Sequence, residues 1–441
     1  MNDGHGSLWP REYIRNFRPK KSLRFAALTW GTRGDVQPFV ALGAELLRRG
    51  HRVLLAARAP FRSFVEEHGL EFHEMEEDGT EDLMRALAKS DGGPQGIGVF
   101  VSSQRDLVGP QFRQFWEASE GADALICNSA FTAPALHIAE HRGLPVFQAF
   151  FDPGFVPTSR YCMADDRIQD FGPFGNMART RLRNVAAGLL SRDIVNAWRK
   201  ERGMKTLGTG ERHHPDLLRR LPVLAAWSPQ LIERPDDWPA WFAQTGRFRL
   251  PVKDDVSPRL RAFMEKGPAP VYIGFGSWGV HEKTELTELL LETLRITGDR
   301  AIFHRNTVDD RRAFPEGVYV DDDLPHDWLF PRMKAVVHHG GAGTTGAVAT
   351  AGVPSIIIPA FFAQAVWGDV LIRKGIGTLL VRRELSAERL ARALQWIDHP
   401  HIRERARALG ERARTDRGEA HAADEIERRL QEAAEHPGGR R

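Results

Sequence analysis

The chain has 441 residues, about three times the ~150 residues of a typical domain, so two domains with room for a further small element are expected. Hydrophobic residues make up 42% and charged residues 27%, which excludes a collagen-like, wholly disordered or repeat-tract protein. Lys and Arg total 61 against 58 Asp and Glu, and a formal net charge of +3 predicts only weak attraction to nucleic acid or acidic membranes.

The N-terminal segment 1–22 is basic and has no apolar run before Phe25, so we interpret it as a short solvated leader and not as a secretory signal. Its basic cluster leaves a peripheral contact with anionic lipid open. No stable membrane insertion is predicted, because no apolar run reaches the roughly 18 residues that a span needs. Cys127 and Cys162 are too few for a disulfide framework and are interpreted as buried thiols of a cytoplasmic protein.

In chain order, the first half alternates strand-like and helix-like runs. Strands are expected at RFAALTW (24–30), HRVLLAA (51–57), ALICNS (124–129) and PVFQAF (145–150), with helices over 40–50 and 133–141. The stretch 227–258 follows, with five prolines and no clear period, and it predicts an ordered crossing segment and linker.

The second half repeats the alternation. Strands are expected at 270–277, 300–304, 317–320, 335–339, 355–360 and 378–381, and helices over 282–296 and from 344. After Ser386 the chain becomes helical and rich in charges of both signs. Alternating β and α units predict parallel sheets with helices on both faces, so two doubly wound α/β domains are expected.

The loop after the strand AVVHH (335–339) carries the strongest chemical signal. Gly340, Gly341 and Gly343 follow His339, and Thr344 opens a helix. Glycines allow backbone amides to approach a ligand closely, and a helix N-terminus offers unpaired N–H groups, so this loop predicts a phosphate-binding site. A histidine beside it can donate a hydrogen bond to a phosphate oxygen. The loop is neither a Walker A motif nor a dinucleotide fingerprint.

The segment 324–371, LPHDWLFPRMKAVVHHGGAGTTGAVATAGVPSIIIPAFFAQAVWGDVL, resembles the nucleotide-sugar signature of GT-B glycosyltransferases. The similar groups are bacterial natural-product transferases of the glycopeptide-antibiotic type and sterol 3-beta-glucosyltransferases, all in the UDP-glycosyltransferase superfamily. GTRGDVQP, WSPQLIERPDDWP and VYIGFGSWG stand in the same order, so the resemblance covers about residues 22–400. It implies two Rossmann-like domains that face a cleft.

The resemblance also implies roles for residues of the second half. His339 with Gly341, Gly343 and Thr344 would hold the donor diphosphate. Ser277 would add a phosphate contact, Gln364 would contact the donor sugar, and Trp328 and Leu329 would lie near the base.

In the loop GTRGDVQP, Asp35 stands near a helix start, where the helix dipole stabilises its charge. A simple helix cap is the alternative interpretation. The resemblance places Asp35 in the position of the general base, which would take the proton of the acceptor hydroxyl as it attacks the anomeric carbon. Attack opposite the leaving group would invert that centre.

The loop FFDPGFVPTSRY supplies Asp152 as a reserve base, although Asp-Pro-Gly is also an ordinary turn. Members of the similar families build their acceptor pocket in this region. The predicted acceptor-binding residues are aromatic: Phe112, Trp116, Phe151 and Phe155. Such walls favour an apolar aglycone with a hydroxyl, such as a natural product, sterol or lipid.

The sequence departs from the family pattern at Ala363, where many members carry an acidic residue that binds hydroxyls of the donor sugar. Gln364 keeps half of that contact. This argues against an ordinary preference for UDP-glucose. A deoxysugar carried on dTDP or UDP fits the pattern, as do donor contacts made from elsewhere, so the donor sugar stays open. Ala347 likewise replaces the ribose-binding glutamate of plant relatives. No cluster has metal-ligand spacing, and His213 with His214 is expected at the surface, so neither a metal nor a further cofactor is predicted.

Together these patterns predict a basic leader (1–22), an acceptor-binding domain (23–250), a nucleotide-sugar-binding domain (251–400) and C-terminal helices with a tail (401–441). The expected partners are a nucleotide sugar and a small acceptor, without nucleic acid; the oligomeric state stays open. Three alternatives remain: a catalytically silent nucleotide-sugar-binding auxiliary protein, a nucleotide-sugar epimerase, and an oxidoreductase, which the absence of a glycine fingerprint disfavours.

Overall fold

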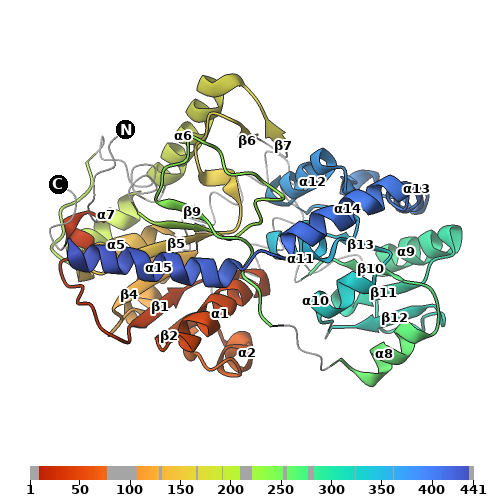
Figure 1. The fold of residues 1–441 in the computed structure, drawn as a ribbon, viewed down its shortest axis with the longest axis horizontal. Coiled ribbons are helices and arrows are strands. Elements are labelled where there is room, and N and C mark those ends of the chain that lie inside the picture. Colours follow the sequence, from red (N-terminus) through yellow and green to blue (C-terminus); the bar gives the residue numbers. More distant parts are fainter. Residues whose placement is uncertain are drawn as a thin grey trace.

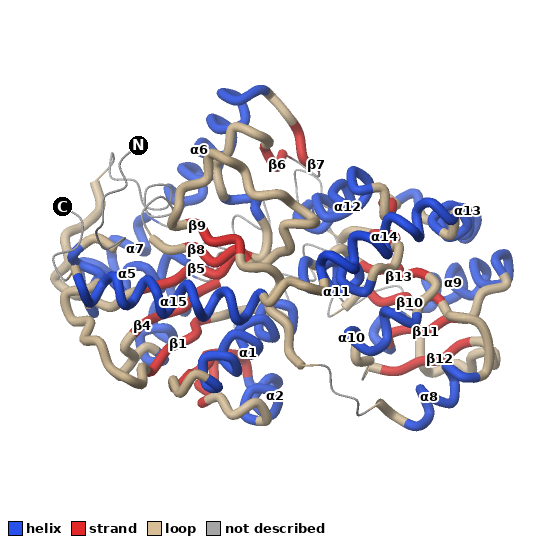
Figure 2. Tube along the Cα trace, in the orientation of Figure 1, coloured by secondary structure: helices blue, strands red, loops and turns tan. Residues whose placement is uncertain are grey.

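The computed structural model describes residues 9–76, 106, 108–128, 132–164, 167–190, 192–208, 221–251, 256–276, 283–322, 324–360 and 362–436. In this part of the chain, two parallel sheets lie side by side, each with helices packed on it (Figures 1 and 2). The predicted fold class is confirmed.

The first sheet has seven strands in the order β3-β2-β1-β4-β5-β8-β9, all parallel. The strands are β1 (Arg24–Leu28), β2 (Arg52–Arg58), β3 (Glu71–Met75), β4 (Ala124–Asn128), β5 (Val146–Phe150), β8 (Val223–Ala225) and β9 (Phe242–Gln244). Its helices are α1 (Arg33–Arg48), α2 (Arg62–Glu66), α5 (Thr132–Arg142), α6 (Gly172–Leu190) and α7 (Arg192–Glu201), with another over 108–118. β1, β4 and β5 are almost wholly buried, because helices cover both faces of a parallel sheet.

The second sheet has six parallel strands in the order β12-β11-β10-β13-β14-β15. They are β10 (Val271–Gly274), β11 (Ala301–His304), β12 (Val318–Asp321), β13 (Ala335–His338), β14 (Ser355–Ile357) and β15 (Gly377–Leu379). The helices of this half are α8 (Pro258–Glu265), α9 (Lys283–Thr297), α10 (His326–Leu329), α11 (Ala342–Ala351), α12 (Phe362–Lys374), α13 (Ala387–Ile397) and α14 (Pro400–Ala413).

Both sheets have a switch point, where the strand order changes direction. In the first sheet the chain runs outward from β1 through β2 to β3 and then returns to β4 on the other side of β1. The second sheet repeats this pattern with β10 and β13. Ligands of doubly wound sheets bind outside the carboxyl ends of the strands at such points. The loops after β1, β4, β10 and β13 are therefore the places to look for chemistry.

The N-terminal segment departs from the expected solvated leader. Trp9, Tyr13, Ile14 and Phe17 are buried in the core of the first domain, and the Trp9 indole donates a 3.1 Å hydrogen bond to the backbone oxygen of Val146. The expectation is wrong for residues 9–17, because four apolar side chains in a basic segment are enough to bind it to the domain.

The stretch 227–258 is more regular than its composition suggests. It contributes the edge strand β9, and Trp227 and Trp238 pack against Phe242 in a buried cluster shared by both domains. The α1 helix likewise begins at Arg33, earlier than the expected 40–50, because Thr32 and Asp35 form a capping box there. Cys127 and Cys162 are buried and not disulfide-bonded, as expected.

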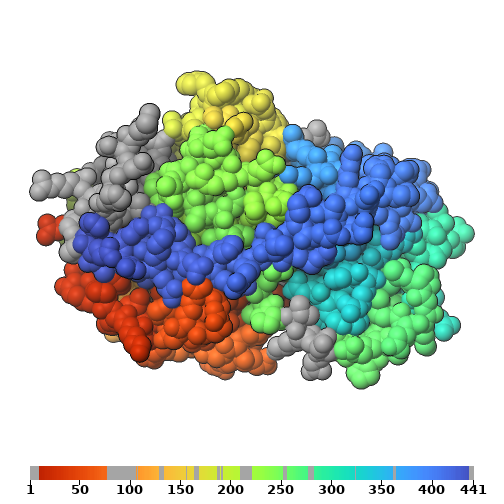
Figure 3. All heavy atoms as spheres, viewed as in Figure 1, coloured from red at the N-terminus to blue at the C-terminus, as the bar shows by residue number. Residues whose placement is uncertain are grey.

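The last helix, α15 (Gly418–Glu435), returns from the second domain and packs on the first. It runs along α1 as the blue band of Figure 3, and Ala422, Ile426 and Leu430 belong to the first domain's core. Arg49 of α1 pairs with Glu427 at 2.7 Å. Where the chain crosses back, Gly418 lies so close to Gly246 that the two interdomain connections touch.

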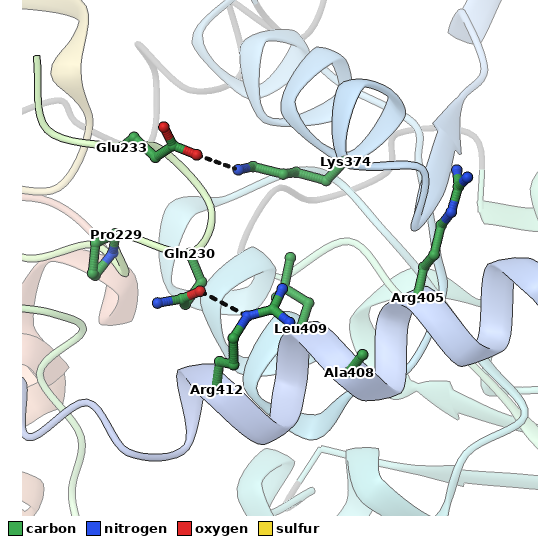
Figure 4. A pocket seen from close by; sticks show the side chains of 8 residues that line it. All are labelled: Pro229, Gln230, Glu233, Lys374, Arg405, Ala408, Leu409 and Arg412. Carbon is green, nitrogen blue, oxygen red and sulfur yellow. Dashed lines mark hydrogen bonds and ion pairs between the residues drawn. The ribbon is translucent and has the colours of Figure 1, made fainter.

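A cavity of about 650 Å³ lies on the domain boundary between the loop after β8 and the helices α12 and α14 (Figure 4). Lys374 reaches Glu233 across it at 3.6 Å, and Arg412 donates to Gln230 at 2.9 Å. Both links join the first domain's loop to helices of the second domain. The cavity walls thus form a polar part of the interface.

Candidate active site

The loop after β1 holds Asp35 in a network of hydrogen bonds at the first turn of α1. One carboxylate oxygen, Oδ2, accepts from the Thr32 backbone N–H at 2.8 Å and from the Thr32 hydroxyl at 3.2 Å. The Thr32 side chain in turn accepts from the Gly34 N–H at 3.3 Å. This capping box fixes the carboxylate at the carboxyl end of β1. Asp35 therefore does serve as a helix cap. Any further role depends on the contacts of its second carboxylate oxygen, Oδ1.

Gly31 is required for this arrangement. Its φ of +109° lies in the left-handed region, and a Cβ placed there would come within 2.5 Å of Oδ2 of Asp35. Any other residue would therefore strain the backbone and displace the carboxylate.

The second oxygen of Asp35, Oδ1, accepts a hydrogen bond of 3.2 Å from the Asn128 side chain. Asn128 is the last residue of β4, the strand beside β1. Burial raises the pKa of Asp35, while the hydrogen bonds from Thr32 and Asn128 and the charge of Arg58 oppose that rise. A carboxylate with a raised pKa is a better proton acceptor than an ordinary surface aspartate.

The glycine-rich loop after β13 leads directly into α11. Gly341 is the N-cap, and Ala342, Gly343 and Thr344 form the first turn, so the helix begins two residues earlier than expected. The first amides of a helix have no carbonyl partner within it, so this turn presents N–H donors with the positive end of the dipole. A Cβ at Gly343 would meet nothing within 4 Å, so the space beside this turn is open. The turn is suited to binding an anion.

His339 closes one side of this loop. A Cβ at Gly276, the last described residue after β10, would lie 2.8 Å from the His339 ring, and a Cβ at Gly341 would lie 2.6 Å from it. The loops after β10 and β13 therefore meet at this imidazole. Ser277, the predicted phosphate contact, lies outside the described residues, immediately after Gly276.

The imidazole of His339 is neutral at physiological pH. Burial lowers its pKa to about 4, although a hydrogen bond to the backbone of Gly274 opposes the effect. His338 beside it is fully buried, and its Nδ1 accepts from the Gly340 N–H at 3.1 Å. Neutral His339 has a single N–H, which donates either to the Gly274 backbone or to a bound anion. The positive potential at the loop must come from other groups.

A cation of the opposite domain, Arg33, donates to Gln37 at 3.2 Å and lies over the Phe64 ring at 4.6 Å. Arg33, the first residue of α1, is close enough to His304 and His326 of the second domain to lower the pKa of both, although burial is the larger cause. The α1 and α11 helices also contact each other. Arg33 is thus a cation between the two domains, next to the Asp35 loop.

The side chain of Gln364 is only partly available to a ligand. It is buried, and its Oε1 accepts a hydrogen bond of 2.8 Å from the Ala360 N–H. The Nε2 amide can donate to a sugar oxygen, while the Ala360 N–H occupies one of the two lone pairs of Oε1. The Ala363 side chain lies outside the described part of the chain.

Trp328 and Leu329 are in α10, with their side chains buried in the second domain. Leu329 is fully buried, and Trp328 packs under the guanidinium of Arg332, 4.2 Å from its ring centroid. Both side chains pack inside the second domain. Leu329 can therefore contact a nucleotide base only through its backbone. Asp327 in the same helix pairs with Arg247 of the interdomain connection at 3.1 Å.

Asp152 follows β5, and its Oδ1 accepts from the Gly154 N–H at 2.9 Å, as in an ordinary Asp-Pro-Gly turn. Burial raises its pKa, and the charge of Arg183 on α6 opposes the rise. Phe151 packs edge-on against Phe39 of α1 at 5.8 Å, so this loop lies beside the Asp35 helix. The Phe155 side chain lies outside the described residues.

Phe112 and Trp116 do not join this group. Phe112 is buried and stacks on Trp198 at 4.6 Å. Trp116 lies under Arg142, the last residue of α5, near the amino ends of the strands. Asp35 lies at the carboxyl ends, so the structure does not bring Trp116 to it.

Sequence reasoning missed Asn128, Arg33, His304 and His326. Asn128 could have been found, because a polar residue that ends an apolar strand next to β1 must lie at the same sheet edge as Asp35. The other three depend on how the two domains approach each other, which no local pattern contains. Among the described residues, no group of His, Cys, Asp and Glu is arranged to hold a metal ion. No described helix has the length and apolarity to cross a bilayer.

Comparisons with known proteins identify the family and the fold. Glycosyltransferase family 28, N-terminal domain, matches residues 25–158, and the C-terminal domain of erythromycin biosynthesis protein CIII-like proteins matches residues 289–428. A sterol 3-beta-glucosyltransferase of Arabidopsis thaliana is 32% identical over 447 residues, which cover 96% of this chain and 70% of the relative. One of Neosartorya fischeri is 34% identical over 451 residues, or 96% of this chain but only 31% of that longer relative.

Solved structures share the fold. The glycosyltransferase of kitacinnamycin superposes with a TM-score of 0.68 at 21% identity, covering 93% of this chain and 100% of the other. The glycosyltransferase VinC, solved in complex with dTDP, superposes with a TM-score of 0.62 at 17% identity, again covering 93% and 100%.

Two doubly wound parallel sheets, with a carboxylate at one switch point and a glycine-rich helix start at the other, form the GT-B fold of glycosyltransferases. The chain belongs to the glycosyltransferase family that includes the sterol 3-beta-glucosyltransferases.

Proposed function

We propose that the protein is an inverting, metal-independent glycosyltransferase that moves a sugar from a UDP- or dTDP-sugar to a hydroxyl of an apolar small molecule. The main support is the placement of Asp35. It lies at the switch point of the first sheet, on the helix that contacts α11 with its open, anion-binding first turn.

In the proposed reaction, the acceptor oxygen attacks the anomeric carbon while the bond from that carbon to the diphosphate breaks. The hydroxyl proton passes to the carboxylate of Asp35, which Thr32 and Asn128 hold in place. The diphosphate leaves with the bonding electron pair. Attack and departure on opposite faces invert the anomeric centre.

Protein groups meet the charge of the departing diphosphate. The amides of the first turn of α11 supply donors, neutral His339 supplies a further N–H, and Arg33 supplies positive charge from the other domain. The proposal needs no metal ion, so turnover should be unchanged by EDTA.

The acceptor class follows from the relatives, which are named for sterols and, among the solved structures, for natural products. Phe151 beside α1 and the loop that carries Asp152 are the proposed acceptor-side residues. Phe112 and Trp116 are not included, because Phe112 packs within the core and Trp116 lies under Arg142, near the amino ends of the strands.

Donor choice is proposed to favour sugars with fewer hydroxyls at the Gln364 contact. With one lone pair of Oε1 of Gln364 engaged by Ala360 and alanine at 363, the site offers a sugar hydroxyl fewer acceptors than an acidic residue followed by Gln would. A buried polar site discriminates through such partners. Deoxysugars on dTDP or UDP therefore fit, and VinC was solved with dTDP.

The donor site can be tested by ligand-induced stabilisation. UDP or dTDP should raise the melting temperature of the wild type, by the equivalent of about 2.7 kcal/mol at a hundredfold excess over Kd. His339→Ala should abolish most of this shift, since it removes a donor at the anion site. His401→Ala, at an exposed position on α14, is the matched control and should respond like the wild type. NAD should give no shift; a shift with NAD alone would favour a dinucleotide enzyme.

Asn128→Ala tests whether the hydrogen bond from Asn128 sets the pKa of Asp35. The hydrogen bond from Asn128 lowers the pKa of Asp35, so its loss should raise that pKa further. A base is active when deprotonated, so the acid limb of the kcat/KM profile should move to higher pH while the rate on the plateau is retained in large part. An unmoved acid limb would show that the Asn128 bond does not tune the essential group.

Ala363 favours one second candidate, a catalytically silent protein that binds nucleotide sugars and supports another transferase. It predicts stabilisation by the nucleotide without release of nucleoside diphosphate in the presence of hydroxylated acceptors. Acceptor-dependent release would exclude it, and release of an isomerised sugar nucleotide without acceptor would indicate an epimerase.

A further inference from the structure

The helix α6 (Gly172–Leu190) has its polar and apolar faces reversed. On an ordinary surface helix the apolar stripe packs on the core and the polar face meets water. Here Asn176, Thr180 and Asn184 are buried, with no more than 2% of each exposed. Phe174, Leu182 and Leu189 are exposed to 87%, 71% and 55%. The helix projects from the first domain, at the top of Figures 1 and 2.

The exposed apolar residues form one stripe. At about 100° per residue, Phe174, Leu182, Val185 and Leu189 fall within a sector of about 80°, and the three buried polar residues fall on the opposite side. Four large apolar side chains aligned over the length of a helix are not scattered surface residues. Contiguous exposed patches of this kind mark interaction sites.

Polar contacts hold the inner face, which explains how the reversed helix is stable. The Asn176 amide donates to the backbone oxygen of Ser159 at 2.9 Å and to Asp170 at 2.8 Å, and accepts from the Phe171 N–H at 2.8 Å. The Thr180 hydroxyl donates to the sulfur of Cys162 at 3.7 Å. The apolar stripe is thus not needed for attachment to the domain.

The charge of the residues beside the apolar stripe indicates which kind of partner the stripe binds. Residues 171–192 contain four arginines and no acidic residue. Arg179 and Arg181 are exposed beside the stripe, whereas Arg183 lies near Asp152 and Arg192 donates to the backbone oxygen of Leu207. A helix with Phe and Leu on one face and arginines along it fits the interface of an anionic bilayer. A symmetric contact between two copies would instead bring the same arginines together.

We propose that the outer face of α6 docks on an anionic lipid surface, with Phe174 and Leu182 entering the acyl boundary and Arg179 and Arg181 at the headgroups. The proposal goes beyond the transferase reaction and does not depend on it, because lipid binding needs neither donor nor acceptor. Docking through α6 would place the first domain, which carries Asp35, next to the membrane.

Vesicle flotation of the full chain, without nucleotide or acceptor, tests the proposal. Vesicles of phosphatidylcholine with phosphatidylglycerol should bind the protein more strongly than phosphatidylcholine alone, and added salt should weaken the binding. Phe174→Asp combined with Leu182→Asp should lower the partition coefficient by tenfold or more, at about 0.8 kcal/mol for each buried methylene. Arg179→Ala should lower it by about fivefold on anionic vesicles only.

Trp396→Asp is the matched control, because Trp396 is a half-exposed aromatic residue of α13 on the second domain. It should bind vesicles like the wild type, and circular dichroism should show all variants folded. Failure of the wild type to bind anionic vesicles would overturn the proposal, as would equal binding by the double variant. A wild-type dimer in sedimentation that the double variant converts to monomer, without vesicle binding, would assign the stripe to a second copy and also overturn it.

Discussion

Replacing Asp35 with asparagine is expected to lower kcat by about 10² to 10⁴-fold, the range that a positioned general base contributes. Asparagine can keep the hydrogen bond to the Thr32 N–H through its side-chain oxygen, so the capping box and the fold should persist. It cannot accept the proton of the acceptor hydroxyl. Initial rates at saturating donor and acceptor measure the loss, and UDP or dTDP should still raise the melting temperature.

The pH dependence gives a second measurement on the same residue. Burial raises the pKa of Asp35, and a base must be ionised to work, so wild-type kcat/KM should fall as the pH drops through that raised pKa. In the asparagine variant this limb should be absent. Asp152→Asn is the comparison, because that carboxylate caps a turn and lies in the neighbouring loop. A larger loss in Asp152→Asn than in Asp35→Asn would move the base to Asp152.

Gly418→Ala is expected to give the largest loss of stability from a single added methyl group, about 1 to 3 kcal/mol. A Cβ at this position would lie 2.3 Å from the backbone oxygens of both Gly246 and Arg247. Backbone atoms cannot move aside as a side-chain end can, so the two interdomain connections must separate. Thermal unfolding of the ligand-free protein measures the loss.

Gly109→Ala is the control for that substitution. It is also a helical glycine, but a Cβ there would meet nothing within 4 Å. Alanine should leave stability unchanged or raise it by up to about 1 kcal/mol, because glycine is the poorer helix former. Equal stability of both variants would mean that the connections do not meet as tightly as the structure has them.

The general architecture could be predicted from the sequence because it depends on local patterns. Apolar strands alternate with helices, and the rule that ligands bind beyond the carboxyl ends of strands directs attention to Asp35 and to the glycine loop. The positions of β3, β8 and β9 were not predicted. β9 lies in a stretch rich in Pro and Trp, where partner strands and the Trp cluster determine the conformation rather than local periodicity.

The candidate site shows the same division. Asp35 and His339 stand in loops whose residues specify their own geometry, through the Thr32 capping box and the glycines around the imidazole. Arg33 and His304 belong to different domains, so their proximity depends on how the two domains pack together. Phe112 and Trp116 illustrate the converse, because aromatic residue type alone does not distinguish a pocket wall from a core. The reversed orientation of α6 also could not be predicted from residue spacing. Periodicity shows that an apolar stripe exists, but not whether it faces the core or the solvent.

The return of α15 to the first domain has a consequence for synthesis on the ribosome. Ala422, Ile426 and Leu430 complete the core of the first domain, yet β10 to β15 are translated before them. Domains emerge and fold from the N-terminus onward. The apolar surface that α15 covers must therefore wait, exposed, until the whole second domain has been made. We therefore expect chaperones to bind the nascent first domain during that interval. Packing of α15 then completes the core of this domain.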